Sequence, residues 1–149
     1  MKKIITIAAI SFALHGCVSY NGNSDKSNSS YEPSMAKTNF EILKQEQYGG
    51  RETEASLVIK SQAELNTLYE SLGQEAAPTI DFTNRNVVAL FMGQKNTGGY
   101  SIGIKSVALD GNTAIVLVER TQPSGMATMA LSAPYCIASI PKAEKTEFR

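Results

Sequence analysis

Short apolar segments separated by turns that contain glycine or proline dominate the chain from Phe40 to Lys142. Most segments alternate apolar and polar residues, as strands with one buried face do. Residues 87–92 are apolar at every position, which predicts a strand covered on both faces. We expect Phe40, Ile42 and Tyr48 to share the buried face of the first strand. The other strands are expected over residues 55–60, 87–92, 100–109, 114–118, 126–131 and 135–140.

One segment has the spacing of a helix. Leu65, Leu68, Tyr69 and Leu72 stand at positions i, i+3, i+4 and i+7 and form one apolar stripe. Residues 61–64 match a capping box before the stripe, and a glycine at position 73 can end the helix after it. The pattern predicts an α+β domain that is mostly β. Its architecture is an antiparallel sheet or small sandwich of about seven strands with one packed helix.

The start of the chain has the pattern of a secretory signal peptide. Residues 2 and 3 are lysines, and the apolar run of residues 4–14 is shorter than the roughly 20 residues that span a bilayer. The run leads into Leu14-His15-Gly16-Cys17, which resembles the bacterial lipobox. We therefore expect residues 1–16 to be removed and Cys17 to carry fatty acyl chains such as palmitate. A plain signal peptide with an incidental cysteine is the alternative.

Residues 18–38 are rich in Ser, Thr and Asn and contain few large apolar side chains. Such a segment buries too little surface to offset the entropy of ordering it. We interpret residues 17–38 as the lipidated cysteine with a flexible tether, residues 39–142 as the globular domain and residues 143–149 as a C-terminal tail. Val18 follows the cysteine where an aspartate would favour the inner membrane. The expected location is therefore extracytoplasmic, on the outer membrane if the host has two.

Composition and charge exclude several classes of function. The chain has 149 residues with equal numbers of basic and acidic side chains, so no nucleic-acid partner is expected. Cleavage before Cys17 would remove His15, the only histidine, and with it histidine-dependent catalysis and metal binding. We predict no enzymatic activity, no catalytic residue, no metal and no cofactor. Cys136 would be the one unmodified thiol, and its apolar neighbours predict a small buried residue.

Several segments of the second half resemble a known family. They lie in order between Val87 and Lys142, and the run from Thr97 to Ile102 is the most specific of them. The segments are residues 87–93, 97–102, 119–125, 133–137 and 141–142. Together they resemble the C-terminal domain of the protease complex subunit PrcB family. The resemblance implies a lipoprotein accessory that binds and stabilises a secreted subtilisin-like protease complex.

Two loops are the candidate partner-binding residues. The first is Thr97, Gly98, Gly99 and Tyr100, where two glycines permit unusual backbone angles or the close approach of a partner. The second is Pro123, Ser124 and Gly125, followed by two methionines that would suit a partner or close the sheet edge. A purely structural turn is the alternative for the first loop, with Tyr100 packed in the core.

The predicted function is a lipid-anchored, protein-binding accessory module of the cell envelope. Its expected partners are the membrane, through the anchor, and an extracytoplasmic protease or other envelope protein. Two alternatives stay open. One is an envelope lipoprotein that binds a small molecule or glycan between sheet and helix. The other is a protease-inhibitor-like domain, because the Thr97–Tyr100 loop is similar to the Asn-Pro-Thr-Thr-Gly loop of chagasin-like inhibitors. Their Arg-Pro-Trp loop has no counterpart, since the chain lacks tryptophan.

Overall fold

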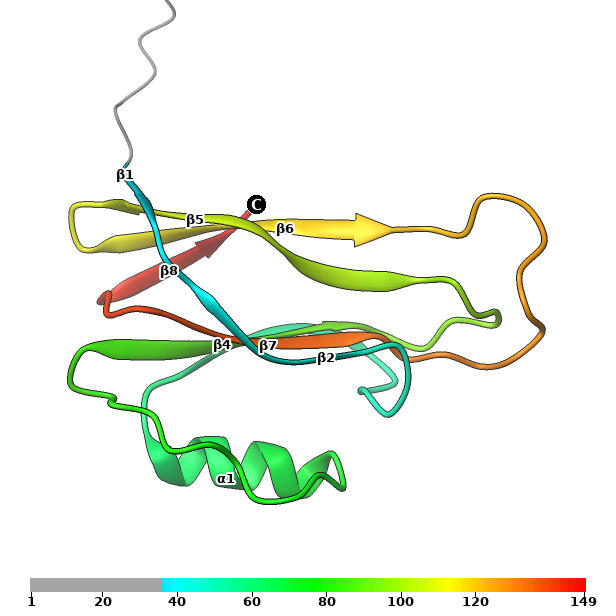
Figure 1. Cartoon of the computed structure of the whole chain (residues 1–149), viewed down its shortest axis with the longest axis horizontal. Helices are drawn as coiled ribbons and strands as arrows, with labels where there is room; N and C mark the ends of the chain where they lie inside the picture. The colour runs from blue at the N-terminus through cyan, green and yellow to red at the C-terminus, as the bar shows by residue number, and fades with distance from the viewer. Residues whose placement is uncertain (1–35) are drawn as a thin grey trace, which may run out of the picture. The chain divides into compact units, whose positions relative to one another are not determined.

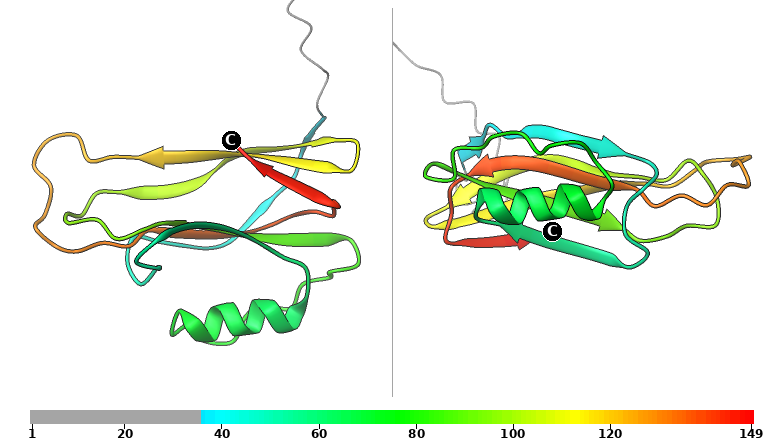
Figure 2. Two further views of the ribbon diagram at one scale, coloured as in Figure 1. Left: turned by 180° about the vertical axis from the view of Figure 1, so that it is seen from behind. Right: turned by 90° about the horizontal axis from the view of Figure 1, so that it is seen from below.

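The computed structural model describes residues 36–149, which form two sheets and one helix in three layers (Figure 1). The outer sheet has the strand order β1-β5-β6-β8, and the middle sheet has the order β2-β7-β4-β3. Helix α1 covers the free face of the middle sheet (Figure 2). The elements are β1 (Ala36–Thr38), β2 (Glu41–Glu46), β3 (Glu54–Ile59), α1 (Gln62–Ser71), β4 (Arg85–Met92), β5 (Ser101–Asp110), β6 (Thr113–Thr121), β7 (Tyr135–Pro141) and β8 (Lys145–Phe148). The predicted fold class is confirmed.

The middle sheet is buried on both faces, as the apolar run of residues 87–92 predicted. On β4, the even-numbered side chains from Val88 to Met92 face the outer sheet. The odd-numbered side chains from Val87 to Phe91 face α1. Strand β7 lies beside β4 and divides its side chains in the same way. Two cores therefore share one sheet, and β4 and β7 contribute to both.

Helix α1 begins and ends where the sequence predicted. The Ser61 hydroxyl accepts a hydrogen bond from the Glu64 backbone N–H at 3.3 Å. The Glu64 carboxylate accepts from the Lys60 N–H at 2.9 Å, one residue earlier than in a standard capping box. At the other end Gly73 has φ = +63°, a conformation that favours glycine and stops the helix. The predicted stripe packs on the middle sheet, with Leu65 fully buried.

The predicted buried face of the first strand is wrong. The pairing of β2 with β7 shifts register between Ile42 and Lys44, so one extra residue is inserted there. Phe40 packs between the two sheets, whereas Leu43 packs on the helix side. Ile42 is 39% exposed and Tyr48 is 52% exposed. A bulge changes which side chains point inward, and the alternation of apolar and polar residues does not predict a bulge.

The boundaries of the domain also differ from the prediction. Strand β1 belongs to the stretch assigned to the tether, and it pairs antiparallel with β5. Strand β8 belongs to the expected C-terminal tail, and it pairs parallel with β6. Both strands are short, so their own alternation is a weak signal and their pairing partners decide their conformation. Residues 126–131 form no strand, because they extend beyond the end of the sheets. The predicted signal peptide and Cys17 lie outside the described residues.

In the described part of the chain, no helix is long and apolar enough to cross a bilayer.

The prediction for Cys136 is confirmed, because its side chain is fully buried between the two sheets. Burial raises the pKa of the Cys136 thiol to about 11. We expect Cys136 of the native protein to resist Ellman's reagent at pH 8 and to react once guanidinium unfolds the domain. The unfolded thiol ionises at lower pH than the folded one. The stability that the neutral, buried Cys136 thiol contributes to the fold is therefore fully present below about pH 9 and is lost as the pH rises toward 11. Fast reaction of the native thiol at pH 8 would contradict the burial.

Candidate functional site at the loop end of the sandwich

Three loops converge at one end of the two sheets (Figure 1). They are residues 47–53 between β2 and β3, residues 93–100 between β4 and β5, and residues 122–134 between β6 and β7. Backbone hydrogen bonds join them. The Gly50 N–H donates to the Ala133 carbonyl at 2.9 Å, and the Lys95 N–H donates to the Ser132 carbonyl at 2.7 Å. The end is therefore one connected structure and not three independent loops.

The two loops predicted as candidate sites lie against each other. The Gly98 N–H donates to the Thr128 carbonyl at 3.0 Å. The Ser132 hydroxyl donates to the Thr97 carbonyl at 2.7 Å. A Cβ placed on Gly99 would lie 2.8 Å from the Cβ of Pro123. Residues far apart in the sequence thus brace the same loop end.

The Thr97–Tyr100 loop serves mainly as a support for its neighbour. Gly98 is buried, and an added Cβ would lie 2.4 Å from the Thr128 Oγ1. Gly99 has φ = +86°, which strains any other residue type. Tyr100 is half-buried against the core between the sheets, and the Lys95 ammonium lies 5.9 Å from its ring centroid. Of the two interpretations left open by the sequence, this geometry favours the structural turn.

The loop between β6 and β7, which the Thr97–Tyr100 loop supports, carries three large apolar side chains that are exposed to solvent. Met126 and Met129 are fully exposed and Leu131 is 62% exposed, all on the loop between β6 and β7. Tyr48 extends from the neighbouring loop toward Gly98, which is hydrogen-bonded to Thr128 of the loop between β6 and β7; its hydroxyl lies 3.5 Å from the position of a Cβ on Gly98. We call Tyr48, Met126, Met129 and Leu131 the apolar tip. Clusters of exposed apolar residues mark interaction surfaces, and methionine adapts its shape to a partner.

Sequence reasoning identified only part of the apolar tip. The two methionines were candidates for a partner loop, but Leu131 was assigned to a strand and Tyr48 to a buried face. Ser124 and Gly125 are exposed on the same loop, and half-buried Pro123 contacts Gly99. The sequence of residues 122–131 did contain a signal, because its large apolar side chains stand among small residues.

The close approach of Gly99 and Pro123 can be tested directly by substitution. Gly99→Ala is expected to lower the free energy of unfolding by about 2–3 kcal/mol, because it adds a clash with Pro123 to the strain of a positive φ. Gly125→Ala is the matched control, since Gly125 also has positive φ but its added Cβ would meet open space. Urea unfolding of both variants measures the difference. Equal destabilisation by the two variants would show that the Gly99–Pro123 contact contributes nothing.

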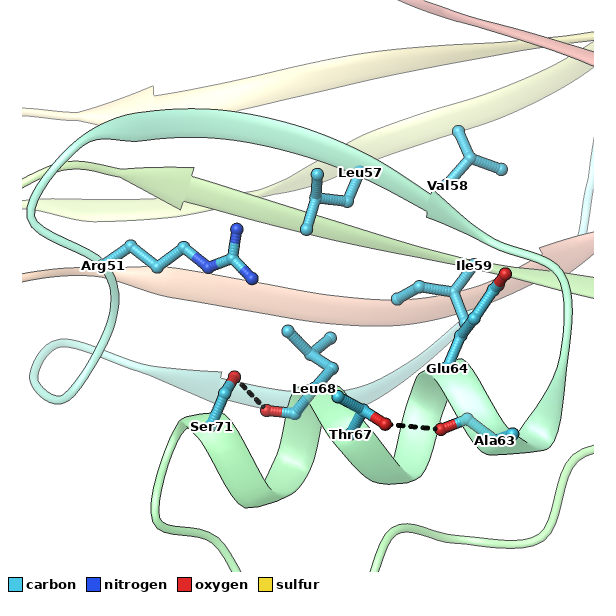
Figure 3. Close-up of a pocket in the computed structure, with 9 residues that line it drawn as sticks. All are labelled: Arg51, Leu57, Val58, Ile59, Ala63, Glu64, Thr67, Leu68 and Ser71. Atoms are coloured by element: carbon cyan, nitrogen blue, oxygen red, sulfur yellow. Dashed lines mark hydrogen bonds between the residues drawn. The ribbon is translucent and has the colours of Figure 1, made fainter.

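A cleft between β3 and α1 is the second place at which a ligand could bind (Figure 3). Its volume is about 480 Å³, and its walls are mostly apolar. The cleft occupies the place between sheet and helix that the small-molecule alternative required. Among the described residues, no group of three or more His, Cys, Asp and Glu side chains could hold a metal ion.

The fold and loop end define a β-sandwich domain with one packed helix and a braced apolar tip. Residues 86–141 match the family described as PrcB C-terminal, which confirms the resemblance recognised from the sequence. The match begins in β4 and ends in β7, and it includes both candidate loops. The family suggests a module associated with a protease complex. The curated proteins yield no match to the chain, and neither do the solved structures.

Proposed function

We propose that this protein is a lipid-anchored accessory module of the cell envelope that binds an extracytoplasmic protein through the apolar tip. A secreted protease is the expected partner, in keeping with the PrcB C-terminal match. The observation that carries the proposal is the exposure of Met126, Met129 and Leu131 on one braced loop. The anchor at Cys17 is part of the proposal and rests on the lipobox-like sequence.

Physical chemistry favours a protein surface as the occupant of the apolar tip. Side chains such as Met126 and Met129 gain free energy when a partner removes them from water, about 25 cal/mol for each Å² of apolar surface buried. The loop that carries them is tied to its neighbours by hydrogen bonds from Gly98 and Lys95. Binding therefore orders less backbone than it would in a free loop, which lowers the entropic cost of association.

The test is affinity capture from solubilised envelopes with the tagged full-length protein. The wild-type chain is expected to retain a protease, identified by mass spectrometry and by proteolytic activity in the eluate. Met126→Ser combined with Met129→Ser is expected to reduce the retained protease at least about tenfold, since few residues carry most of the energy of an interface. Leu117→Ser is the matched control, because Leu117 is exposed on β6 away from the tip.

Two outcomes would contradict the proposal. The first is equal recovery of the protease by the wild type and the Met126, Met129 double variant. The second is that the double variant captures every protein that the wild type captures. Urea unfolding of the double variant provides a check, because both side chains are fully exposed and their replacement should leave stability unchanged.

A further inference from the structure

The cleft between β3 and α1 has the form of a groove along the edge of a sheet (Figure 3). Strand β3 forms one wall and α1 forms the other, and nothing in the described residues covers the space between them. The six side chains on which the argument depends are Arg51, Leu57, Ile59, Ala63, Thr67 and Leu68. The groove shares no residue with the apolar tip, and the inference does not rest on the proposed function.

Strand β3 is the one regular, full-length sheet edge among the described residues. It pairs with β4 alone, in continuous register over its six residues. The other three edges are protected: β1 and β8 have only three and four residues, and β2 carries a bulge. Proteins usually blunt their edge strands, because the unpaired backbone groups recruit other chains. An unblunted edge beside an apolar groove therefore suits the addition of a further strand.

The walls match the side-chain pattern of an added strand. Leu57 and Ile59 are alternate residues of β3 and face α1. Ala63 and Thr67 stand one turn apart on α1 and are small, which leaves room between helix and strand. Leu68, also on α1, lines the groove with them. Side chains of an extended peptide point alternately to the two faces, so every second one would enter the groove.

Arg51 places a positive charge at one end of the groove. Its guanidinium carbon lies 4.9 Å from the ring centroid of Phe91, which is fully buried, so the charge is held over a fixed platform. Within the described residues Arg51 belongs to none of the salt bridges, which join Lys44 to Glu46, Arg120 to Glu54 and Arg149 to Glu147. The planar guanidinium is thus available for a carboxylate, which it binds in bidentate fashion.

The direction of β3 identifies which carboxylate fits. Arg51 precedes the first residue of β3, Glu54, so it lies at the N-terminal end of that strand. A strand added antiparallel to β3 ends there, and its terminal carboxylate would meet Arg51. Residues 145–149 are engaged elsewhere, because β8 pairs with β6 and the Arg149 carbonyl accepts a hydrogen bond from the Val118 N–H at 2.7 Å. A free terminal carboxylate of another protein fits this position.

We infer that the groove between β3 and α1 binds the C-terminal peptide of a partner as an added antiparallel strand. Alternate apolar side chains enter the groove and the terminal carboxylate pairs with Arg51. The backbone of β3 supplies the hydrogen bonds, and the groove supplies the preference for apolar residues at every second position.

The test begins with a display library of random heptapeptides that end in a free carboxylate, selected on the full-length protein. Selected peptides are expected to carry apolar residues at alternate positions. The most enriched peptide, labelled with fluorescein at its N-terminus, is then titrated by anisotropy. We expect its C-terminal amide form to bind at least about tenfold more weakly. Arg51→Met should give the same loss while its apolar stem still covers Phe91. Lys105→Met, which removes a positive charge from an exposed position on β5, should bind as the wild type does.

Hydrogen exchange separates strand addition from other occupants of the groove. The bound peptide is expected to slow exchange of β3 backbone amides, which a fatty acid or other small ligand would not do. Three results would overturn the inference: no peptide is enriched, the acid and amide forms bind equally, or exchange in β3 is unchanged by saturating peptide. The Met126, Met129 double variant should bind the peptide normally. Failure of the groove and failure of the apolar tip are therefore distinguished.

Discussion

Phe91→Ala is expected to lower the free energy of unfolding by about 3–5 kcal/mol, the largest effect we predict for one substitution. Phe91 is fully buried in β4, at the centre of the core shared with α1. Its ring stacks on Tyr135 with centroids 6.1 Å apart and supports the Arg51 guanidinium at 4.9 Å. Truncation removes both contacts and leaves a cavity that the flanking sheet cannot fill by local movement.

Equilibrium unfolding in urea measures this loss. Phe82→Ala is the matched control, because Phe82 packs at the edge of the same core and is only partly buried. We expect that control to cost less than half as much, since the site lies in a loop that can rearrange. A Phe91→Ala variant that is no less stable than Phe82→Ala would contradict the position of β4 at the centre of the domain.

Cys17→Ser is expected to abolish incorporation of an alkyne-labelled fatty acid, which the wild-type protein should take up during growth. The lipobox-like run ending at Cys17 is the basis of this expectation. Each buried methylene contributes about 0.8 kcal/mol to membrane binding, so two or more acyl chains give a stable anchor. A variant whose residues 1–17 are replaced by a secretory signal without a lipobox should move from the membrane pellet to the soluble fraction.

Cys136→Ala is the control for the labelling experiment. Cys136 is buried between the sheets and should carry no acyl chain, so its loss should leave fatty-acid uptake unchanged. Undiminished labelling of Cys17→Ser would refute the proposed anchor. So would recovery in the membrane pellet of the variant that lacks residues 1–17.

Elements with strong local signals were predictable from the sequence. Helix α1 has its own cap at Ser61 and stop at Gly73, and its stripe needs no distant information. Residues 87–92 of β4 are apolar at every position because the strand is covered on both faces, and the sequence pattern indicates that directly. In both elements local preference and tertiary environment agree, which is why the pattern sufficed.

Features that depend on distant partners were not predictable. The bulge at Ile42 is visible only in the register with β7. Strand β8 has four residues and is fixed by its parallel pairing with β6. The candidate loops were recognised separately, but their contact joins Gly98 to Thr128, thirty residues further along the chain. A single sequence does not indicate which distant residues come into contact, so the apolar tip was recognised only in the structure.

The most direct test of the account is site-specific photocrosslinking in intact envelopes. A benzophenone side chain replaces Met129 at the apolar tip in one full-length variant and Leu117 on the outer sheet in another. We expect a covalent adduct with an extracytoplasmic protease from position 129 and none from position 117. No adduct at position 129, or the same adducts from both positions, would contradict binding through the apolar tip.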